Sequence, residues 1–336
     1  MSAQTADAPL QPCKKPRYTR ITQQELPACK PRLTPVVVVS VFVVIGAAFL
    51  PVGYVCLNAS KSVVETAQRY DDTCIPGATT QDREAFLYQL NGDGTLCNVT
   101  LTAPRHMAAP VFLYYELDNF YQNHRRYLNS KSDAQLRGGS MATASLHSSC
   151  SPQDLLNGSS SAPIDPCGLV AWSNFNDTFQ LLLNGATLDD QHIAWESDID
   201  HQFGDVAPTN FNTISSLRGG GTLNGTLKDE HFVVWMRAAA LRNFRKLWGR
   251  INQDIPAGTN VTIQIQNRYN TYAFNGQKKV VLSTATWLGG ANPFLGVAFL
   301  ATGAASVAFG AAFALLALFT QYEMGDSSRL SWNENK

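Results

Sequence analysis

Charged side chains are missing from two long stretches of this 336-residue sequence. Residues 36–57 contain none in 22 positions, and residues 280–322 contain none at all. About 20 apolar helical residues cover the roughly 30 Å hydrocarbon core of a bilayer. We therefore predict membrane spans at residues 36–57 and 294–320. The first span is expected to be retained, because the tail before it is too long, polar and basic for a cleaved signal peptide.

The missing charge also limits what these spans do. Ionisable residues inside a membrane usually mark an ion or substrate path, and neither predicted span contains one. Two charge-free helices are therefore not expected to form a transport route by themselves. Pro51 and Gly53 are expected to bend the outer end of the first span.

Familiar catalytic signatures are absent as well. The sequence has no G-x-x-x-x-G-K-[ST] phosphate loop, no G-x-S-x-G nucleophile elbow and no H-E-x-x-H metal helix. Neighbouring acids are one alternative, since glycosidases use two carboxylates, but such acids are more commonly just solvated. The candidates are Asp189, Asp190, Glu196, Asp198 and Asp200. We expect no catalytic residue and no cofactor.

What the sequence does contain begins with a basic N-terminal tail. Six Lys or Arg residues precede the first span against two acidic residues, and basic flanks stay cytosolic. Both termini are therefore expected in the cytosol, as tails of residues 1–35 and 321–336, with residues 58–293 forming an exoplasmic or lumenal domain. A nucleic-acid role for the basic cluster is the alternative; its position just before a span favours the topological interpretation, and we expect no nucleic-acid partner.

Four of the seven cysteines fall in the segment assigned to the oxidising side: Cys74, Cys97, Cys150 and Cys167. An even number suits a disulfide framework, and four cysteines allow three connectivities. We expect Cys74–Cys97 and Cys150–Cys167, because this pairing closes the shortest loops. A metal site using His147 and Cys150 is the competing interpretation, but no paired short cysteine spacing supports it, so we expect no metal.

Asn-x-Ser/Thr sequons are confined to the same outer segment. Asn58 abuts the membrane and is expected to be unused. The expected glycosylation sites are Asn98, Asn157, Asn176, Asn224 and Asn260. Neither tail contains a sequon, so the sequons agree with the topology that the charges predict.

The outer segment is expected to be an antiparallel β-rich domain decorated with short helices. Residues 111–117, rich in β-branched and aromatic side chains, predict a strand. Apolar residues at helical intervals predict an amphipathic helix within residues 230–251. Residues 261–265 alternate apolar and polar, and Asn275-Gly276 precedes a second apolar run, which predicts a hairpin.

The second span carries small residues at seven-residue intervals. These are Gly296, Gly303 and Gly310, and small residues let membrane helices approach closely. We expect this face to receive a helix of a partner protein. The alternative is that glycine is simply frequent in membrane helices.

Two blocks of the outer segment resemble a known family. They are YYELDNFYQNHRRYLNSKSDAQLRG at residues 114–138 and PCGLVAWSNFNDTF at residues 166–179. Residues 23–35, 232–251 and 282–299 agree with it in the same order. The chain resembles the flippase accessory subunits named after cell-division-cycle protein fifty and the ligand-effect modulator, over nearly its whole length.

The resemblance implies a partner and a role. Members of this family form complexes with type IV P-type ATPases, which move phospholipid from the exoplasmic to the cytosolic leaflet. The subunit escorts the ATPase out of the endoplasmic reticulum and stabilises it, and membrane lipid surrounds both. The resemblance places the chain in the endoplasmic reticulum, Golgi, endosomes or plasma membrane, and the ATPase carries the catalytic D-K-T-G sequence, which this chain lacks.

Individual residues can be carried over from the family. Cys150 and Cys167 match its second disulfide, and Asn176 in FNDTF matches a recurrent glycosylation position. Expected partner contacts lie in the FYQNHRRY block, at Phe120, Tyr121, Asn123, Arg125 and Arg126. The alternative functions are a two-span surface receptor or adhesion glycoprotein that binds a ligand through its outer domain and, third, an ectoenzyme that uses Glu196 or a neighbouring acid.

Overall fold

The computed structural model describes residues 18–23, 26–27, 34–90, 92–139, 143–156, 162–183, 185–209, 211, 223 and 225–319. The chain divides into two compact units. One comprises Met1–Leu50 with Ala301–Lys336, and the other comprises Pro51–Leu300. The first contains most of the two long helices, and the second contains the whole β-rich domain.

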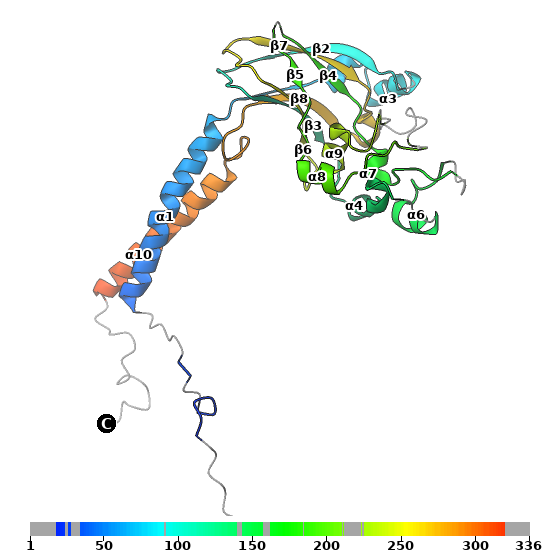
Figure 1. Cartoon of the computed structure of the whole chain (residues 1–336). Coiled ribbons are helices and arrows are strands. Elements are labelled where there is room, and N and C mark those ends of the chain that lie inside the picture. The colour runs from blue at the N-terminus through cyan, green and yellow to red at the C-terminus, as the bar shows by residue number, and fades with distance from the viewer. Residues whose placement is uncertain are drawn as a thin grey trace, which may run out of the picture. The chain divides into compact units, whose positions relative to one another are not determined.

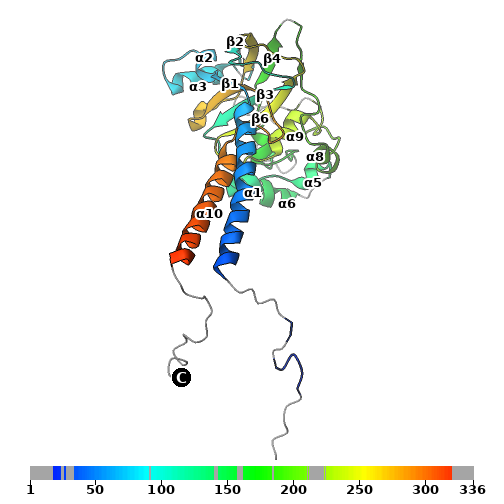
Figure 2. The same ribbon diagram turned by 90° about the vertical axis from the view of Figure 1, so that its left-hand side faces the viewer.

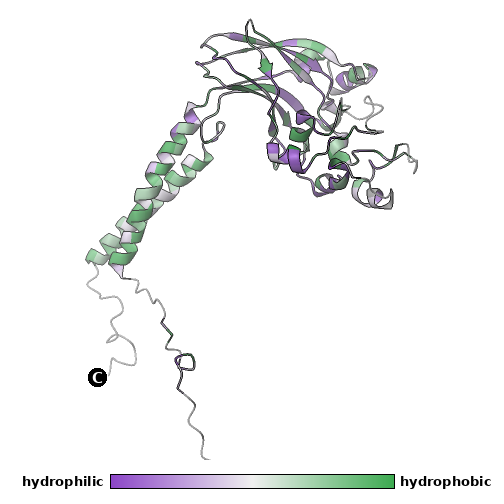
Figure 3. Ribbon diagram, in the orientation of Figure 1, coloured by the Kyte–Doolittle hydropathy of each residue, from purple (hydrophilic) through white to green (hydrophobic). Residues whose placement is uncertain are grey.

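Both predicted spans are helices. The first is α1 (Pro35–Ser62) and the second is α10 (Phe294–Phe319). They lie side by side (Figures 1 and 2) and are hydrophobic along their length (Figure 3). Only 11% and 17% of their most apolar windows are buried within the protein. Core helices of soluble proteins are mostly buried, so helices of this length with uncovered apolar faces identify a membrane protein.

The glycines of α10 pack on α1. Within residues 51–300, a Cβ atom added to Gly296 would lie 2.7 Å from the backbone nitrogen of Leu57. Within the other unit, a Cβ on Gly303 would lie 3.0 Å from the Leu50 side chain, and a Cβ on Gly310 would lie 3.3 Å from that of Phe42. This corrects the expectation that the three glycines receive a partner's helix: α1 of the same chain occupies that face, because small residues let the two backbones approach.

The strands form two antiparallel sheets. The larger sheet has the order β1-β8-β3-β6-β5 and the smaller has the order β2-β7-β4. The larger sheet comprises β1 (Glu65–Arg69), β8 (Gln277–Ser283), β3 (Val111–Asp118), β6 (Phe244–Ile251) and β5 (Leu188–Asp189). The smaller comprises β2 (Thr95–Thr102), β7 (Asn260–Asn267) and β4 (Thr178–Leu182). The predicted antiparallel β-rich fold and the strand at residues 111–117 are confirmed.

Alternation of buried and more exposed residues explains why these segments are strands. In β3 and β7 every second side chain is buried, as a half-buried sheet requires. Val261, Ile263 and Ile265 of β7 are completely buried, and Val111, Leu113 and Leu117 of β3 are 1% exposed or less. The residues between them are only partly buried.

Short helices complete the outer domain, and several gather on one side of the strands (Figure 1). They are α2 (Asp71–Cys74), α3 (Thr80–Gln89), α4 (Arg125–Asn129), α5 (Asp133–Leu136), α6 (Thr143–Cys150), α7 (Leu169–Trp172), α8 (Glu196–His201), α9 (Glu230–Met236) and the 3-10 helix η3 (Tyr272–Phe274). Asp229 caps α9, since its carboxylate accepts a hydrogen bond from the Phe232 backbone nitrogen at 2.9 Å.

Two secondary-structure predictions were wrong. The helix expected within residues 230–251 ends at Met236, and β6 begins at Phe244. The apolar residues of β6 mimic helical spacing, but Lys246 between them is buried, which only the strand period explains. The expected hairpin is also wrong, because β7 and β8 belong to different sheets.

The outer domain contains two disulfides, Cys74–Cys97 and Cys150–Cys167. The first joins α2 to β2, and the second joins the end of α6 to the segment before α7. These are the two pairs expected from the shortest loops. Cys56 of α1 is a buried free thiol.

Candidate partner-docking face of the outer domain

The FYQNHRRY block divides between the interior and the surface. Phe120 packs against four aromatic rings, with its centroid 5.3 Å from that of Phe274 and 5.7 Å from that of Trp235. Tyr121 is 50% exposed, and Arg125 and Arg126 are also exposed. Of the five contacts expected in this block, Phe120 is therefore packed against the domain core, whereas the other four, Asn123 included, are exposed.

Asn123 and its buried neighbour hold a loop. The Asn123 side-chain amide donates to the carbonyl oxygen of Ala240 at 2.9 Å. The side-chain oxygen of Gln122 accepts from the Ala239 backbone nitrogen at 2.8 Å. These bonds fix the connection between α9 and β6, so this part of the block shapes a neighbouring pocket.

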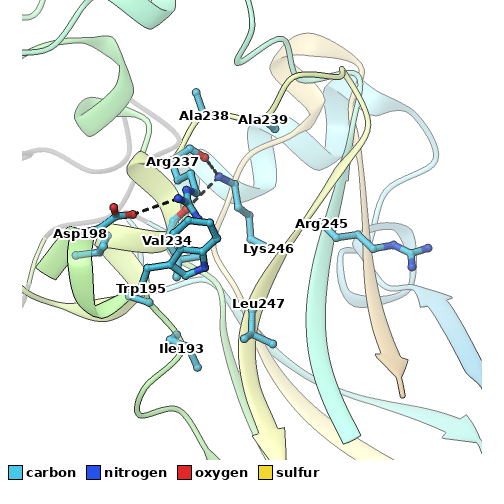
Figure 4. Close-up of a pocket in the computed structure, with 12 residues that line it drawn as sticks. Ile193, Trp195, Asp198, Val234, Arg237, Ala238, Ala239, Arg245, Lys246 and Leu247 are labelled. Carbon is cyan, nitrogen blue, oxygen red and sulfur yellow. Dashed lines mark hydrogen bonds and ion pairs between the residues drawn. The ribbon is translucent and has the colours of Figure 1, made fainter. Parts of the chain in front are cut away.

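That pocket has a volume of about 350 Å³ and lies between α8, α9 and β6 (Figure 4). It draws on two stretches of chain: one precedes and enters α8, and the other runs from α9 into β6. The second stretch belongs to the block at residues 232–251 that resembles the accessory-subunit family. Four of its lining residues carry polar or aromatic side chains that contact one another or the end of α9: Trp195, Asp198, Arg237 and Lys246.

Trp195 and Arg237 dominate its rim. The Arg237 guanidinium carbon lies 3.3 Å from the centroid of the Trp195 ring, a cation-π contact. The Asp198 carboxylate forms an ion pair with the same guanidinium, with 3.7 Å between the nitrogen and oxygen atoms. Trp195 nevertheless remains 62% exposed. Tryptophan and arginine are enriched among residues that dominate protein–protein binding, so this exposed pair is a candidate docking surface.

Lys246 lies beneath this pair. Its ammonium donates to the carbonyl oxygens of Val234, at 3.0 Å, and Arg237, where α9 ends. A cation at the C-terminus of a helix is favourable because the last carbonyls are unpaired there. The residue is only 7% exposed, and burial, followed by the positive charge of Arg237, lowers the pKa of Lys246 to about 7.

Glu230 holds the segment that precedes Trp195. Its two carboxylate oxygens accept hydrogen bonds from three successive backbone nitrogens: His192 at 2.9 Å, Ile193 at 2.6 Å and Ala194 at 2.9 Å. Next to it, His231 stacks on Trp248 with ring centroids 3.8 Å apart. Burial lowers the pKa of His231, so the imidazole is neutral at physiological pH.

A second pocket of about 230 Å³ adjoins the first. The two pockets share Asp198, Val233, Arg237 and Ala238. The other residues of the second pocket include Leu128, Lys131 and Leu136, which belong to the block at residues 114–138. Two of the blocks that resemble the family therefore converge on one hollowed face, which we call the α8–α9 face.

The FNDTF segment serves a different purpose, because its aspartate is the centre of a buried network. Asp177 is completely buried and forms an ion pair with Lys278 at 2.7 Å, while its other oxygen accepts from the backbone nitrogens of Arg268 and Tyr269 at 2.5 and 2.6 Å. The Tyr70 hydroxyl donates to Asp177 at 2.6 Å, and burial raises the pKa of this phenol well above its usual value.

The sequons divide between described and undescribed parts of the chain. Asn98 of β2 and Asn260 of β7 are exposed, and Asn176 is half-buried beside Asp177. Asn157 and Asn224 lie outside the described residues. Asn58 lies within α1.

Two of the candidate acids form ion pairs with arginines. Asp189 bonds to Arg250 at 3.3 Å, and Asp198 faces Arg237 as described above. Within the described ranges, no group of three or more His, Cys, Asp or Glu side chains is arranged to hold a metal ion. His147 instead bonds to Asp154 at 2.7 Å, while Cys150 is in a disulfide.

Two apolar helices and a disulfide-bonded β-rich domain with a hollowed face together define a membrane-anchored protein with one large folded domain. The chain belongs to the LEM3 (ligand-effect modulator 3)/CDC50 family, whose family model matches residues 56–323. ALA-interacting subunit 3 of Arabidopsis thaliana is 46% identical over 329 residues, covering 96% of this chain and 92% of that protein. Cell cycle control protein 50B of Homo sapiens is 33% identical over 342 residues, covering 93% and 95% respectively.

Three important residues of this face were missed from the sequence. Trp195, Arg237 and Lys246 come from separate elements, and no local spacing connects them. Lys246 falls within the helix predicted at residues 230–251, whereas the structure buries it in a strand. Only the acids next to Trp195 in the sequence were singled out, and they were considered for catalysis rather than for binding.

Proposed function

We propose that this chain is the non-catalytic accessory subunit of a type IV P-type ATPase, forming a heterodimer that moves phospholipid from the exoplasmic to the cytosolic leaflet. Membership of the LEM3/CDC50 family carries this proposal, and the name of one relative describes it as an interacting subunit. The ATPase supplies the reaction. This chain supplies binding surface, through its helices, its tails and its outer domain.

In the proposed topology the outer domain lies on the side of the membrane where the lipid substrate is collected. The basic N-terminal tail supports a cytosolic N-terminus, and two spans return the C-terminus to the same side. Residues 58–293 are then exoplasmic or lumenal, where the two disulfides form. In this compartment Asn98, Asn157, Asn176, Asn224 and Asn260 are the glycosylation sites.

The α8–α9 face is the part of the outer domain that docks on the ATPase. Its Trp195–Arg237 contact is held rigidly by Glu230 and Asp198, so little side-chain entropy is lost on binding. Tyr121, Arg125 and Arg126 extend the proposed contact. The endoplasmic reticulum is the site of assembly, and export to the Golgi, endosomes or plasma membrane follows assembly.

Depletion and rescue test the function directly. Removing the chain from its cells is expected to retain the ATPase in the endoplasmic reticulum and to abolish uptake of fluorescent phospholipid, and the wild-type chain restores both. If ATPase export and lipid asymmetry survive the depletion, the proposed function is wrong.

A matched pair of substitutions tests the docking face separately. Trp195→Ala combined with Arg237→Ala is expected to weaken ATPase capture at least tenfold, since centrally placed anchors each contribute about 2 kcal/mol or more. Leu96→Ala is the control, because Leu96 is 60% exposed on the other sheet and Trp195 is 62% exposed. Equal capture by both variants would exclude the α8–α9 face as the docking site.

A further inference from the structure

The two connections between the outer domain and its helices differ in length. Val63 and Val64 alone join α1 to β1, whereas residues 284–293 join β8 to α10. Both connections begin at the same level, because β1 and β8 are paired and Val64 and Thr284 exchange hydrogen bonds of 2.9 and 3.0 Å. The connection from β8 to α10 is therefore longer than is needed to join the sheet to the helices.

The distance to be covered is short. The Gly296 position of α10 packs on Leu57 of α1, and α1 continues for five residues beyond Leu57 to Ser62. At 1.5 Å per helical residue, this extension spans about 7.5 Å. The headgroup layer on each side of a bilayer is about 5–8 Å thick. The surplus chain therefore lies at the depth of the headgroups once the helices cross the membrane.

The surplus chain is folded into a tight turn. Thr286 and Gly289 donate backbone hydrogen bonds to each other's carbonyl oxygens, both at 2.9 Å, and Gly289 has a φ of +104°. Trp287 and Leu288 form the tip. Tips of turns in water are usually built from Gly, Pro, Asn, Asp and Ser. An apolar tip held by a closed hydrogen-bonded turn is thus not explained by exposure to water.

The tryptophan of this turn is exposed, and the segment around it carries no charge. Trp287 is 72% exposed within the protein, and Phe294, which begins α10, is 75% exposed. No charged residue occurs between Lys279 and Glu323, so no side-chain charge opposes insertion of this segment into the membrane surface. Tryptophan is enriched at the membrane–water interface, where its apolar ring and polar N–H are both accommodated.

We propose that the Thr286–Gly289 turn is a membrane-interface anchor, whose Trp287 and Leu288 side chains insert into the headgroup layer of the exoplasmic leaflet. The anchor binds the zwitterionic phospholipid surface itself. It rests on the proposed two-span topology, and it requires no ATPase. It fixes the depth of the β8–α10 connection independently of any partner.

Depth-dependent fluorescence quenching tests this anchor. The full-length chain is placed in phosphatidylcholine nanodiscs that contain lipid brominated near the headgroup, with and without the P-type ATPase. The difference between wild type and Trp287→Phe isolates the emission of Trp287, and phenylalanine preserves an apolar tip. The matched control is Trp195→Phe, since Trp195 is exposed to a similar extent but lies on the α8–α9 face.

We expect the Trp287 difference signal to lose most of its intensity on shallow bromination, both with and without the ATPase, and the Trp195 difference signal to remain unquenched without it. A Trp287 signal that is unquenched in both samples, or shielded only when the ATPase is present, would overturn the anchor. Flotation of the same variants with lipid vesicles tests the spans separately: loss of flotation contradicts the topology, whereas flotation without quenching contradicts only the anchor.

Discussion

The outer domain and the helix pair are stabilised by different interactions. The domain buries ions, hydrogen-bonded polar groups, aromatic rings and two disulfides. The helix pair contains no charged residue between positions 36 and 57 or between 294 and 319, and its helices approach through glycines. The difference follows from solvent: hydrophobic burial and directed polar contacts stabilise a domain in water, whereas close packing associates helices in lipid.

The buried ion pair gives the outer domain its sharpest sensitivity to substitution. Asp177→Asn leaves the Lys278 ammonium buried without its carboxylate, which costs about 3–5 kcal/mol in comparable sites. The free energy of unfolding of the outer domain is expected to fall by this amount in denaturant titrations, and export from the endoplasmic reticulum is expected to fail.

This substitution has an informative control. It retains an Asn-x-Thr sequon at Asn176, so a loss of stability is not a loss of the glycan. Thr178→Ser also keeps the sequon and changes an exposed residue, so wild-type stability is expected. If Asp177→Asn unfolds at the same denaturant concentration as Thr178→Ser, the buried network does not stabilise the domain.

The second disulfide is expected to raise the free energy of unfolding by the amount that the loop-closure entropy model predicts. Cys150 and Cys167 are 17 residues apart, for which the loop-closure model gives about 3 kcal/mol. The double substitution Cys150→Ser, Cys167→Ser should lower the unfolding free energy by this amount. Comparison with the Cys74→Ser, Cys97→Ser pair, whose separation is 23 residues, sharpens the test, because the model predicts a nearly equal loss.

The helix pair is expected to respond to volume rather than charge. A Cβ at Gly296 meets the Leu57 backbone at 2.7 Å, whereas a Cβ at Gly310 meets the Phe42 side chain at 3.3 Å. Gly296→Ala should therefore destabilise the pair by about 1–3 kcal/mol through overpacking, and Gly310→Ala should have a smaller effect. Unfolding in mixed detergent and lipid micelles measures both. A larger effect at Gly310 would contradict the contact.

The smallest expected effect concerns Lys246, whose pKa is lowered from 10.5 to about 7. Between these values the folded state holds a neutral amine while the unfolded state remains protonated, so stability rises with pH. Below about pH 7 the amine is protonated in both states, and the cost of its burial is complete. Wild type should therefore gain thermal stability from pH 7 to 9 relative to Lys246→Met. A constant difference would show that the hydrogen bonds to the carbonyl oxygens of Val234 and Arg237 keep the amine charged.

The same contrast explains what was predictable from the sequence. Both long helices, β3 and the disulfide pairs were predicted, because run length, residue type and cysteine spacing are local signals. β6 was mistaken for a helix because Phe244, Trp248 and Ile251 recur at helical intervals. In the strand, a register shift between Leu247 and Gly249 lets both Trp248 and Ile251 be buried. The pairing of β7 with β2 and β4 was missed because it is set by contacts far apart in sequence.

The α8–α9 face was harder to predict from the sequence for the same reason. The FYQNHRRY block was expected to hold partner contacts, yet Phe120 packs against the core and Asn123 bonds a loop. Their contribution to the surface is indirect. The Trp195–Arg237 contact depends on the position of α8 relative to α9, and no spacing in the sequence encodes it.

The central claim is that this chain acts as the accessory subunit of an ATPase. Affinity purification of the full-length chain, tagged at its own locus and expressed at its native level, with quantitative mass spectrometry, tests it most directly. A type IV P-type ATPase recovered in amounts comparable to the chain itself is the predicted result. Recovery of the intact, membrane-inserted chain without any P-type ATPase would contradict it.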